Sequence, residues 1–464
     1  MSSLADRVRG IVKPRSSDVA QGSSNVAQGS SNVAQGFSPA SGAAPASVTG
    51  DVASILGGKW RDDCFVVERR LEPSRRHGRE TVGTLSERIA RSSSEATLFG
   101  TGTPRPPFVF FDLETTGLNG GAGTQVFLVG CGSFSGDAAF ITRQFLLTRV
   151  GDEQALLATV RAELERAGAI VTFNGKSFDA PLLETRYLFH RLEWIGDGLP
   201  HVDVLHAARR FWGAPPDMVG RRFSGAGTAP LKGCATYGGS TNGTDCSLTA
   251  LERRLLGAPR TGDIPGFEVP SRYFRFVRTG DPQPLVAVLD HNRRDLLTLA
   301  ALTARLLHLS RVGPEAARDA AEALALGRTY MRAGDEDRAR DAFVRAVAMS
   351  RAPAGAFDPI RIDSLRALAL AWRRARHFEE AAQCWRQLTE IRGCPPHIAR
   401  EAAEALAIHH EHRIRDLAAA RQFALLSMDA DEAPAWTRAV QHRLARIDRK
   451  INARPPWFSS SSPS

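Results

Sequence analysis

The stretch Phe108–Gly117, FVFFDLETTG, decides the fold. Its four leading apolar residues run into Asp112, Glu114 follows two places on, and a Thr-Thr-Gly turn ends the stretch. An apolar run bounded by Pro106-Pro107 and Gly117 predicts a buried strand. Because alternate residues of a strand share a face, Asp112 and Glu114 are expected to point the same way.

Two carboxylates side by side at the end of a buried strand repel each other and resist desolvation. A divalent cation between them would remove both penalties, because hard cations such as Mg²⁺ take carboxylate oxygens as ligands. The alternative is a strand end with two solvated acids that bind nothing. The stretch therefore predicts a metal site, and the remainder of the chain bears on the choice.

Composition sets the outer limits of the interpretation. The chain has 464 residues, of which 43% are hydrophobic, so it suits two or three domains with sizeable cores. Lys and Arg number 60 against 50 Asp and Glu, for a formal net charge of +10. A basic balance is compatible with a polyanionic partner such as nucleic acid.

The compartment is inferred from what the chain lacks. Its six cysteines form no C-x-x-C pair and no zinc-like spacing with histidine, which favours a reducing compartment over a disulfide framework. The chain contains no run of about 18 apolar residues, so a membrane span is not predicted. The N-terminal arginines have no apolar segment behind them, so a signal peptide is not predicted. We therefore expect a cytoplasmic protein with no membrane partner.

The N-terminal part divides into a linker and an extension. Residues 16–36 repeat SSDVAQG, SSNVAQG and SSNVAQG, and this Gly- and Ser-rich repeat predicts a disordered, low-complexity linker over 1–50. Residues 51–104 are expected to pack on the domain that follows, with a strand at Cys64–Glu68. The arginines of 69–79 suit either a solvated loop or a nucleic-acid contact.

Residues 105–312 predict an α/β domain with a mixed sheet flanked by helices. Strands are expected at 108–111, 126–130, 139–147 and 169–173, the first three as an antiparallel meander. Helices are expected at 153–167, from near Asp179, after His201–Leu205, and from Ser247, which is a plausible N-cap. Residues 224–245 have the composition of a loop insertion.

A long helix predicted from Pro284 to about Leu309 carries the second clue. Positions 285, 288, 292, 295, 299, 302 and 306 form one apolar stripe that is interrupted by Asn292 and Asp295. Asp295 therefore faces inward, where an unpaired carboxylate would cost several kcal/mol. Its partner is a cationic side chain, a hydrogen-bond donor of the core, or a metal ion. His291 lies one turn earlier, so it is either a histidine that reaches the same pocket or an ordinary satisfied or surface histidine.

The C-terminal third predicts an all-α domain of helical repeats over 313–450, followed by a flexible tail at 451–464. Leu326, Tyr330, Ala339 and Phe343 recur 42 places on as Leu368, Trp372, Ala381 and Trp385. Large and small residues at this spacing are typical of tetratricopeptide-like helical hairpins, which commonly bind protein partners.

Four acids now form a set that resembles the DEDD exonuclease superfamily of the ribonuclease-H-like fold: Asp112, Glu114, Asp179 and Asp295. The superfamily's D-x-E motif matches the first two. Its Asn before Phe-Asp matches residues 174–179. Its Tyr or His shortly before the last Asp matches His291. In DEDD enzymes that residue is a Tyr four places before the last Asp or a His five places before it, whereas here a His stands four before.

More narrowly, residues 51–310 and the helical repeats are similar to the YprB-like bacterial group of predicted exonucleases. Five stretches in order carry this resemblance: FFDLETTGL, FNGKSFDAPLLETR, SLTALERRLLG, DIPGFEVPSRYFRFVRTGD and HNRRDLLTLAAL.

The resemblance implies a metal-dependent 3′–5′ exonuclease on single-stranded DNA or RNA, with two divalent cations, Mg²⁺ or Mn²⁺. The four acids would bind the cations, and His291 would accept a proton from the attacking water. Thr115, Asn174 and Lys176 are candidates for contacting the substrate, although 174–176 also suits a turn that orders Asp179. Asp203 is either an outer acid of the site or a solvated strand end. The alternative functions are a catalytically weak nucleic-acid adaptor and a helical-repeat scaffold for protein partners.

Overall fold

The computed structural model describes residues 48–117, 123–213, 245–350, 353, 355–428 and 434–453. Most of the predicted N-terminal linker, the loop insertion before Asp245 and the tail after 453 lie outside these residues. The linker was expected to extend to residue 50, but helix α2 (Val48–Leu56) already begins at Val48. No described helix combines the length and apolar character needed to cross a membrane.

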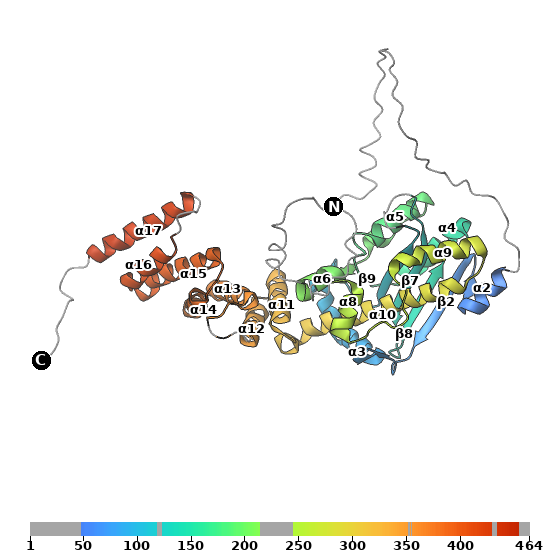
Figure 1. Ribbon diagram of the computed structural model, residues 1–464, viewed down its shortest axis with the longest axis horizontal. Coiled ribbons are helices and arrows are strands. Elements are labelled where there is room, and N and C mark those ends of the chain that lie inside the picture. Colours follow the sequence, from blue (N-terminus) through green and yellow to red (C-terminus); the bar gives the residue numbers. More distant parts are fainter. Residues whose placement is uncertain are drawn as a thin grey trace, which may run out of the picture. The chain divides into compact units, whose positions relative to one another are not determined.

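Within the described residues, one mixed sheet forms the centre of the N-terminal two thirds (Figure 1). Its strand order is β1-β2-β8-β7-β6-β9-β10-β5. The strands are β1 (Lys59–Arg61), β2 (Cys64–Leu71), β5 (Gly100–Thr101), β6 (Phe108–Thr115), β7 (Val126–Phe134), β8 (Phe140–Leu146), β9 (Ala169–Thr172) and β10 (His201–Asp203). A separate hairpin pairs β3 (Arg76–His77) with β4 (Glu80–Thr81).

The predicted meander is confirmed, because β6 pairs with β7 and β7 with β8, both antiparallel. Strand β9 then pairs parallel with β6 and with β10, which makes the sheet mixed. In the register of the meander, Asp112 of β6 lies opposite Gly130 of β7, and Gly130 lies opposite Gln144 of β8. These three residues therefore stand in one row across three strands.

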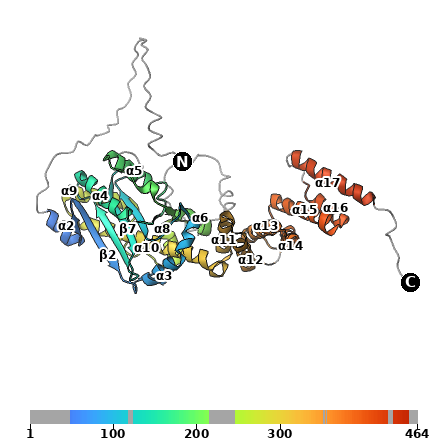
Figure 2. The same cartoon turned by 180° about the vertical axis from the view of Figure 1, so that it is seen from behind.

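Helices cover both faces of the sheet (Figures 1 and 2). Phe108 and Phe110 belong to one core with α3, α6 and the C-terminal part of α10, whereas Val109 and Phe111 belong to another with α2, α4, α5 and α9. By alternation, Asp112 and Glu114 continue the face of Phe108 and Phe110. The helices are α3 (Val82–Ser92), α4 (Glu153–Leu164), α5 (Asp179–Phe189), α6 (Val204–Trp212), α8 (Leu248–Leu251), α9 (Val269–Thr279) and α10 (Gln283–Val312).

The C-terminal third is helical, as predicted. Each helix packs on the next one along the chain. Leu326, Tyr330, Ala339 and Phe343, which begin the predicted repeat, are all buried. Their tetratricopeptide-like character stays a prediction. The helices are α11 (Ala320–Ala333), α12 (Glu336–Met349), α13 (Pro359–Arg374), α14 (Phe378–Glu390), α15 (Pro396–His409), α16 (Leu417–Leu426) and α17 (Pro434–Asn452).

One buried carboxylate ties the first repeat helix to the sheet domain. Glu322 of α11 is 1% exposed, and it accepts a hydrogen bond from Trp212 Nε1 at 2.9 Å. It also accepts one from the backbone N–H of Arg318 at 2.8 Å and pairs with Arg305 of α10. A buried charge that is paired and hydrogen-bonded in this way is expensive to break, so α11 is fixed to its neighbours.

Candidate metal centre

Strand β6 places the two motif acids. Both Asp112 and Glu114 are partly buried at the end of an otherwise buried strand. Asp112 accepts a hydrogen bond at Oδ2 from Nδ2 of Asn292, which lies 2.8 Å away on α10. One oxygen of Asp112 is therefore held by a neutral donor that leaves its negative charge in place.

Asp179 is the first residue of α5 and is 7% exposed. The turn before it is ordered by Asp203, whose carboxylate accepts from the backbone N–H of Asn174 at 2.9 Å and of Lys176 at 3.1 Å. Asn174 has φ +70°, a left-handed conformation that Asn tolerates better than most residues. This local geometry sets where α5 and its first acid begin.

Asp203 also caps helix α6 by accepting from the backbone N–H of Leu205 at 3.1 Å. Asp203 is only 1% exposed. The interpretation of this residue as a solvated strand end is therefore wrong, because three backbone donors converge on a buried carboxylate. The sequence could not show this convergence, because β10 is too short for its alternation to indicate which way Asp203 faces.

The predicted acids influence one another through their charges. Burial raises the pKa of Asp112 well above its usual value, and the charges of Asp295, Glu114 and Asp179 raise it further. The pKa of Glu114 is raised by burial and then by Asp295 and Asp179. Burial, followed by the charge of Asp203, raises the pKa of Asp179 to about 7. The fold thus brings the predicted acids of β6, α5 and α10 close enough for their ionised forms to repel one another.

The acids of this cluster differ in whether a hydrogen-bond donor or a cationic side chain contacts them. Among the described residues, no hydrogen-bond donor or cationic side chain contacts the carboxylates of Glu114 and Asp179. Asp295, in contrast, forms an ion pair with Arg260, whose side chain is 6% exposed. The structure therefore supports the salt bridge among the alternatives that the sequence left open for Asp295.

Arg260 is shared by three acids. It pairs with Glu252 and Asp295, and its Nη1 lies 3.0 Å from Oδ2 of Asp263. Burial alone would lower the pKa of Arg260, but the charges of Asp295 and Glu252 outweigh it and raise that pKa. Sequence reasoning missed Arg260 and Asp263, since both lie in an irregular segment between α8 and α9 where no periodicity marks an inward side chain.

His291 bridges two of these acids. Its Nδ1 lies 2.9 Å from Oδ1 of Asp263, and its Nε2 lies 3.5 Å from Oδ2 of Asp295. The side chain is 13% exposed. In a neutral ring, a proton held on Nδ1 by Asp263 leaves Nε2 as the basic nitrogen. The helical i, i+4 spacing thus brings His291 into contact with Asp295.

A divalent cation fits the chemistry of this cluster, although the side chains do not converge on one point. Across the described ranges, no three His, Cys, Asp or Glu side chains are arranged so that they could hold a metal ion. Asp295 is paired with Arg260, and one oxygen of Asp112 accepts a hydrogen bond from Asn292. The remaining carboxylate oxygens are nevertheless the ligands that Mg²⁺ and Mn²⁺ prefer, and no cationic side chain of the described residues pairs with them.

The three predicted substrate-contacting residues differ in their exposure to solvent. Thr115 is 8% exposed, and its hydroxyl donates to the carbonyl of Gly117 at 2.9 Å, so it is used within the turn. Asn174 is exposed and Lys176 is partly exposed. Burial lowers the pKa of Lys176, while the charge of Asp203 opposes that effect. Lys176 and Asn174 therefore remain the accessible candidates.

The basic run of 69–79 forms the end of β2 and the β3–β4 hairpin. Arg69 donates to the carbonyls of Leu56 at 2.7 Å and Gly57 at 2.8 Å, and Arg70 pairs with Glu72 and Asp137. These two arginines are thus engaged within the chain, which weakens the nucleic-acid alternative for them.

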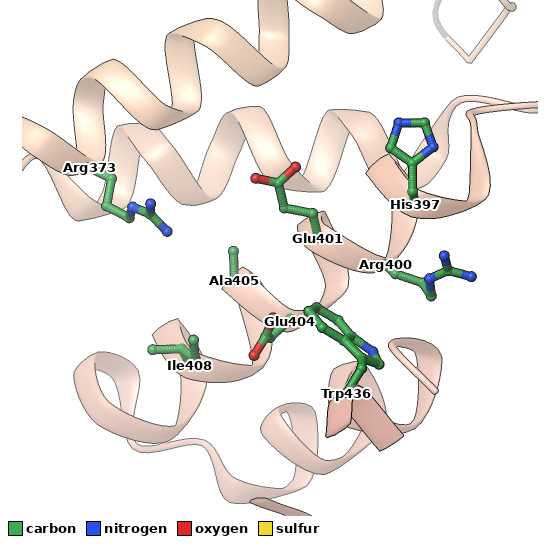
Figure 3. A pocket seen from close by; sticks show the side chains of 8 residues that line it. All are labelled: Arg373, His397, Arg400, Glu401, Glu404, Ala405, Ile408 and Trp436. Carbon is green, nitrogen blue, oxygen red and sulfur yellow. The ribbon is translucent and has the colours of Figure 1, made fainter. Parts of the chain in front are cut away.

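A separate cavity of about 370 Å³ lies among the repeat helices and is lined from α13, α15 and α17 (Figure 3). Arg373, His397, Arg400 and Trp436 are among its lining residues. None of the clustered acids contributes to its wall.

Comparison with known proteins gives two matches. Residues 109–307 match the family model of the RNase_H superfamily. The chain is also similar to the protein YprB of Bacillus subtilis (strain 168), with 30% identity over 404 residues, which is 84% of this chain and 87% of YprB. The family-model match spans all the clustered acids, and the match to YprB extends well beyond it.

Proposed function

The chain belongs to the family of YprB within the RNase H superfamily, and from this premise we propose that it is a metal-dependent nuclease of the DEDD type. RNase H-like membership by itself suggests a nucleic-acid hydrolase. The finer proposal is a 3′–5′ exonuclease that acts on single-stranded DNA or RNA. One observation carries it: the fold brings Glu114 and Asp179 close enough to Asp112 to raise its pKa, and these three acids have no cationic partner among the described residues.

Each acid has a role in this proposal. Asp112, Glu114, Asp179 and Asp295 would together hold two divalent cations, Mg²⁺ or Mn²⁺. Bound cations of this kind activate water and stabilise the negative charge of a leaving oxygen. Asp295 is a full ligand only if it exchanges or shares its contact with Arg260.

His291 would accept the proton of the attacking water at Nε2. Asp263 supports this assignment, because in a neutral ring its carboxylate would accept from Nδ1–H and so favour the tautomer in which Nε2 is unprotonated. Lys176 and Asn174, next to Asp179 along the chain, would contact phosphates of the strand. Thr115 contributes less directly, through the turn that follows Glu114.

The Arg260–Asp295 ion pair favours a second candidate function, a nucleic-acid-binding adaptor with weak turnover. A guanidinium already neutralises the fourth acid, which would reduce the affinity for a second cation. The cavity among the repeat helices is a candidate site for a protein partner in either case.

Degradation of end-labelled single-stranded DNA and RNA tests the proposal. The full-length protein is incubated with Mg²⁺ or Mn²⁺, beside Asp112→Asn and a control, Asp137→Asn, which alters an exposed acid in the β7–β8 turn. A 3′–5′ exonuclease releases a 3′-terminal label at once and progressively shortens a 5′-labelled strand.

The outcomes separate the two candidates. Metal-dependent shortening that Asp112→Asn abolishes and Asp137→Asn preserves supports the exonuclease. Tight strand binding without shortening in either metal supports the adaptor. Internal cleavage fragments would contradict the exonuclease assignment while retaining the nuclease.

A further inference from the structure

Two buried amides connect the motif strand to the long helix. Asn292 of α10 and Gln144 of β8 are both fully buried, at 0% exposed. Nε2 of Gln144 donates to the carbonyl of Leu289 at 2.8 Å and to Oδ1 of Asn292 at 2.9 Å. Nδ2 of Asn292 then donates to Oδ2 of Asp112 at 2.8 Å. The result is one chain of hydrogen bonds from the α10 backbone to the first motif acid.

The direction of this chain is fixed by its starting point. A backbone carbonyl only accepts, so the Gln144 atom that faces Leu289 must be the amide nitrogen. That nitrogen also faces Asn292, which must therefore present its oxygen to Gln144. The N–H group of Asn292 is left to face Asp112. The orientation of both amides thus follows from the network itself, without separate assignment of nitrogen and oxygen.

Gly130 makes room for the network. It lies between Asp112 and Gln144 in the row that crosses β6, β7 and β8. A Cβ atom at position 130 would stand 2.2 Å from Oδ1 of Asn292, far closer than van der Waals contact allows. The missing side chain lets Asn292 reach down from α10 and join the residues on either side.

We propose that Asn292, held by Gln144 over Gly130, is a positioning residue that orients the Asp112 carboxylate for cation binding. The inference rests on the proposed metal-dependent function. A neutral N–H donor fixes Oδ2, leaves Oδ1 without a hydrogen-bond donor among the described residues, and does not neutralise the charge that Asp112 would offer to a cation. The Arg260–Asp295 pair contrasts with this arrangement, because there the orienting group also neutralises the acid.

Partners that orient metal ligands typically contribute about 10- to 100-fold to metal affinity. Asn292→Leu removes the donor to Asp112 with little change in volume. Gln144→Met leaves Asn292 in place but releases its amide to rotate, so its effect should be smaller. Thr303→Val is the matched control: Thr303 is buried on the same helix, and its hydroxyl donates to the helix carbonyl of Leu299.

The test is Mn²⁺ binding to the full-length protein without nucleic acid, by calorimetry or by the loss of the free-ion paramagnetic resonance signal. The unfolding midpoint in EDTA is recorded for each variant. We expect Asn292→Leu to weaken Mn²⁺ binding about 10- to 100-fold, Gln144→Met to weaken it less, and Thr303→Val to leave it unchanged. A purely structural amide network would lower the midpoint in EDTA while the folded variants bound Mn²⁺ as the wild type does.

That last result would overturn the positioning role and leave the nuclease proposal standing, provided that Asp112→Asn abolishes Mn²⁺ binding. If Asn292→Leu fails to fold, Gln144→Met decides by the same criterion. A wild-type protein that binds no Mn²⁺ would overturn both proposals, since no cation would then need an oriented Asp112.

Discussion

Replacing Asp179 by Asn should stabilise the metal-free protein at alkaline pH while removing a proposed ligand. The carboxylate of Asp179 is 7% exposed, begins helix α5, and has a pKa raised to about 7 by burial and by Asp203. An unfolded Asp titrates near 3.8. Between these two values the folded state keeps a proton that the unfolded state has lost.

The sign follows from this difference. Unfolding free energy falls with rising pH wherever the folded state binds more protons. Asp179 therefore lowers the stability progressively from about pH 4 to about pH 7, by at most about 4 kcal/mol, because each pKa unit corresponds to about 1.4 kcal/mol. An Asn at this position has no such penalty. It also forfeits the favourable interaction of an ionised Asp with a helix N-terminus, about 0.3–1 kcal/mol.

We expect Asp179→Asn to be more stable than the wild type by about 1–4 kcal/mol at pH 8 in EDTA, and by no more than about 1 kcal/mol at pH 4.5. Urea unfolding at both pH values, followed by tryptophan fluorescence, measures the difference. Added Mn²⁺ should raise the urea midpoint of the wild type more than that of the variant. The difference in stability between the two proteins should therefore shrink or change sign.

Asp137→Asn serves as the control of opposite sign. Asp137 is exposed, and hydrogen bonds from Arg70 and Ser135 lower its pKa to about 2, so its loss should slightly destabilise the protein at pH 8. A stabilisation by Asp179→Asn that is equal at both pH values, or absent at pH 8, would refute the charge-repulsion account of the cluster.

Three further predictions concern the surroundings of the acids. Arg260→Gln should lower the unfolding free energy in EDTA by about 3–5 kcal/mol, because it leaves Asp295 and its neighbours without their shared cation. Mn²⁺ should restore more stability to this variant than it adds to the wild type in thermal unfolding, and equal responses would argue against a cation site at Asp295. Gly130→Ala should cost about 1–3 kcal/mol and displace the amide of Asn292, as measured by urea unfolding beside Gly136→Ala, where a Cβ meets nothing within 4 Å; equal losses at the two glycines would contradict the steric argument. Asp203→Asn should cost about 1–3 kcal/mol in the same assay, because an amide presents only one acceptor to three backbone donors, and a neutral result would show that water replaces the lost acceptor.

The sheet was predictable from the sequence because its central strands carry continuous apolar runs. Strands β6, β7 and β8 each bury most of their residues, and the short connection between β7 and β8 implies antiparallel pairing. Alternation along β6 then places Asp112 and Glu114 on one face. The long apolar stripe of α10 likewise identifies Asp295 as an inward acid. These inferences depend only on the periodicity of strands and helices.

The contacts of these acids could not be predicted in the same way. Arg260 and Asp263 lie in an irregular segment, where spacing says nothing about direction. The partnership of Gln144 with Asn292 depends on the register of three strands and on the height of α10 above them. Asn292 was visible only as a polar interruption of an apolar stripe. Three-dimensional contacts between distant segments therefore determine the partners of residues whose presence the sequence already reveals.

The segment that precedes the motif strand closes the sheet at both edges. Strands β1 and β2 extend it beyond β8, and β5 extends it beyond β10. The outermost strands, β1 and β5, have only three and two residues. Long unpaired edges invite pairing with other chains, whereas very short edge strands offer little to pair with.

This arrangement has a consequence for expression and biogenesis. A protein started at residue 105, just ahead of the motif strand, would keep every clustered acid but expose the backbone of β8 and β10. Such a fragment should aggregate on overexpression. In the intact chain, residues 59–101 emerge from the ribosome first. Strand β1 can pair with β2 at once, whereas the second edge of β2 and strand β5 stay unpaired until β8 and β10 have been synthesised. The nascent sheet therefore depends on early strands that later cover the edges of β8 and β10.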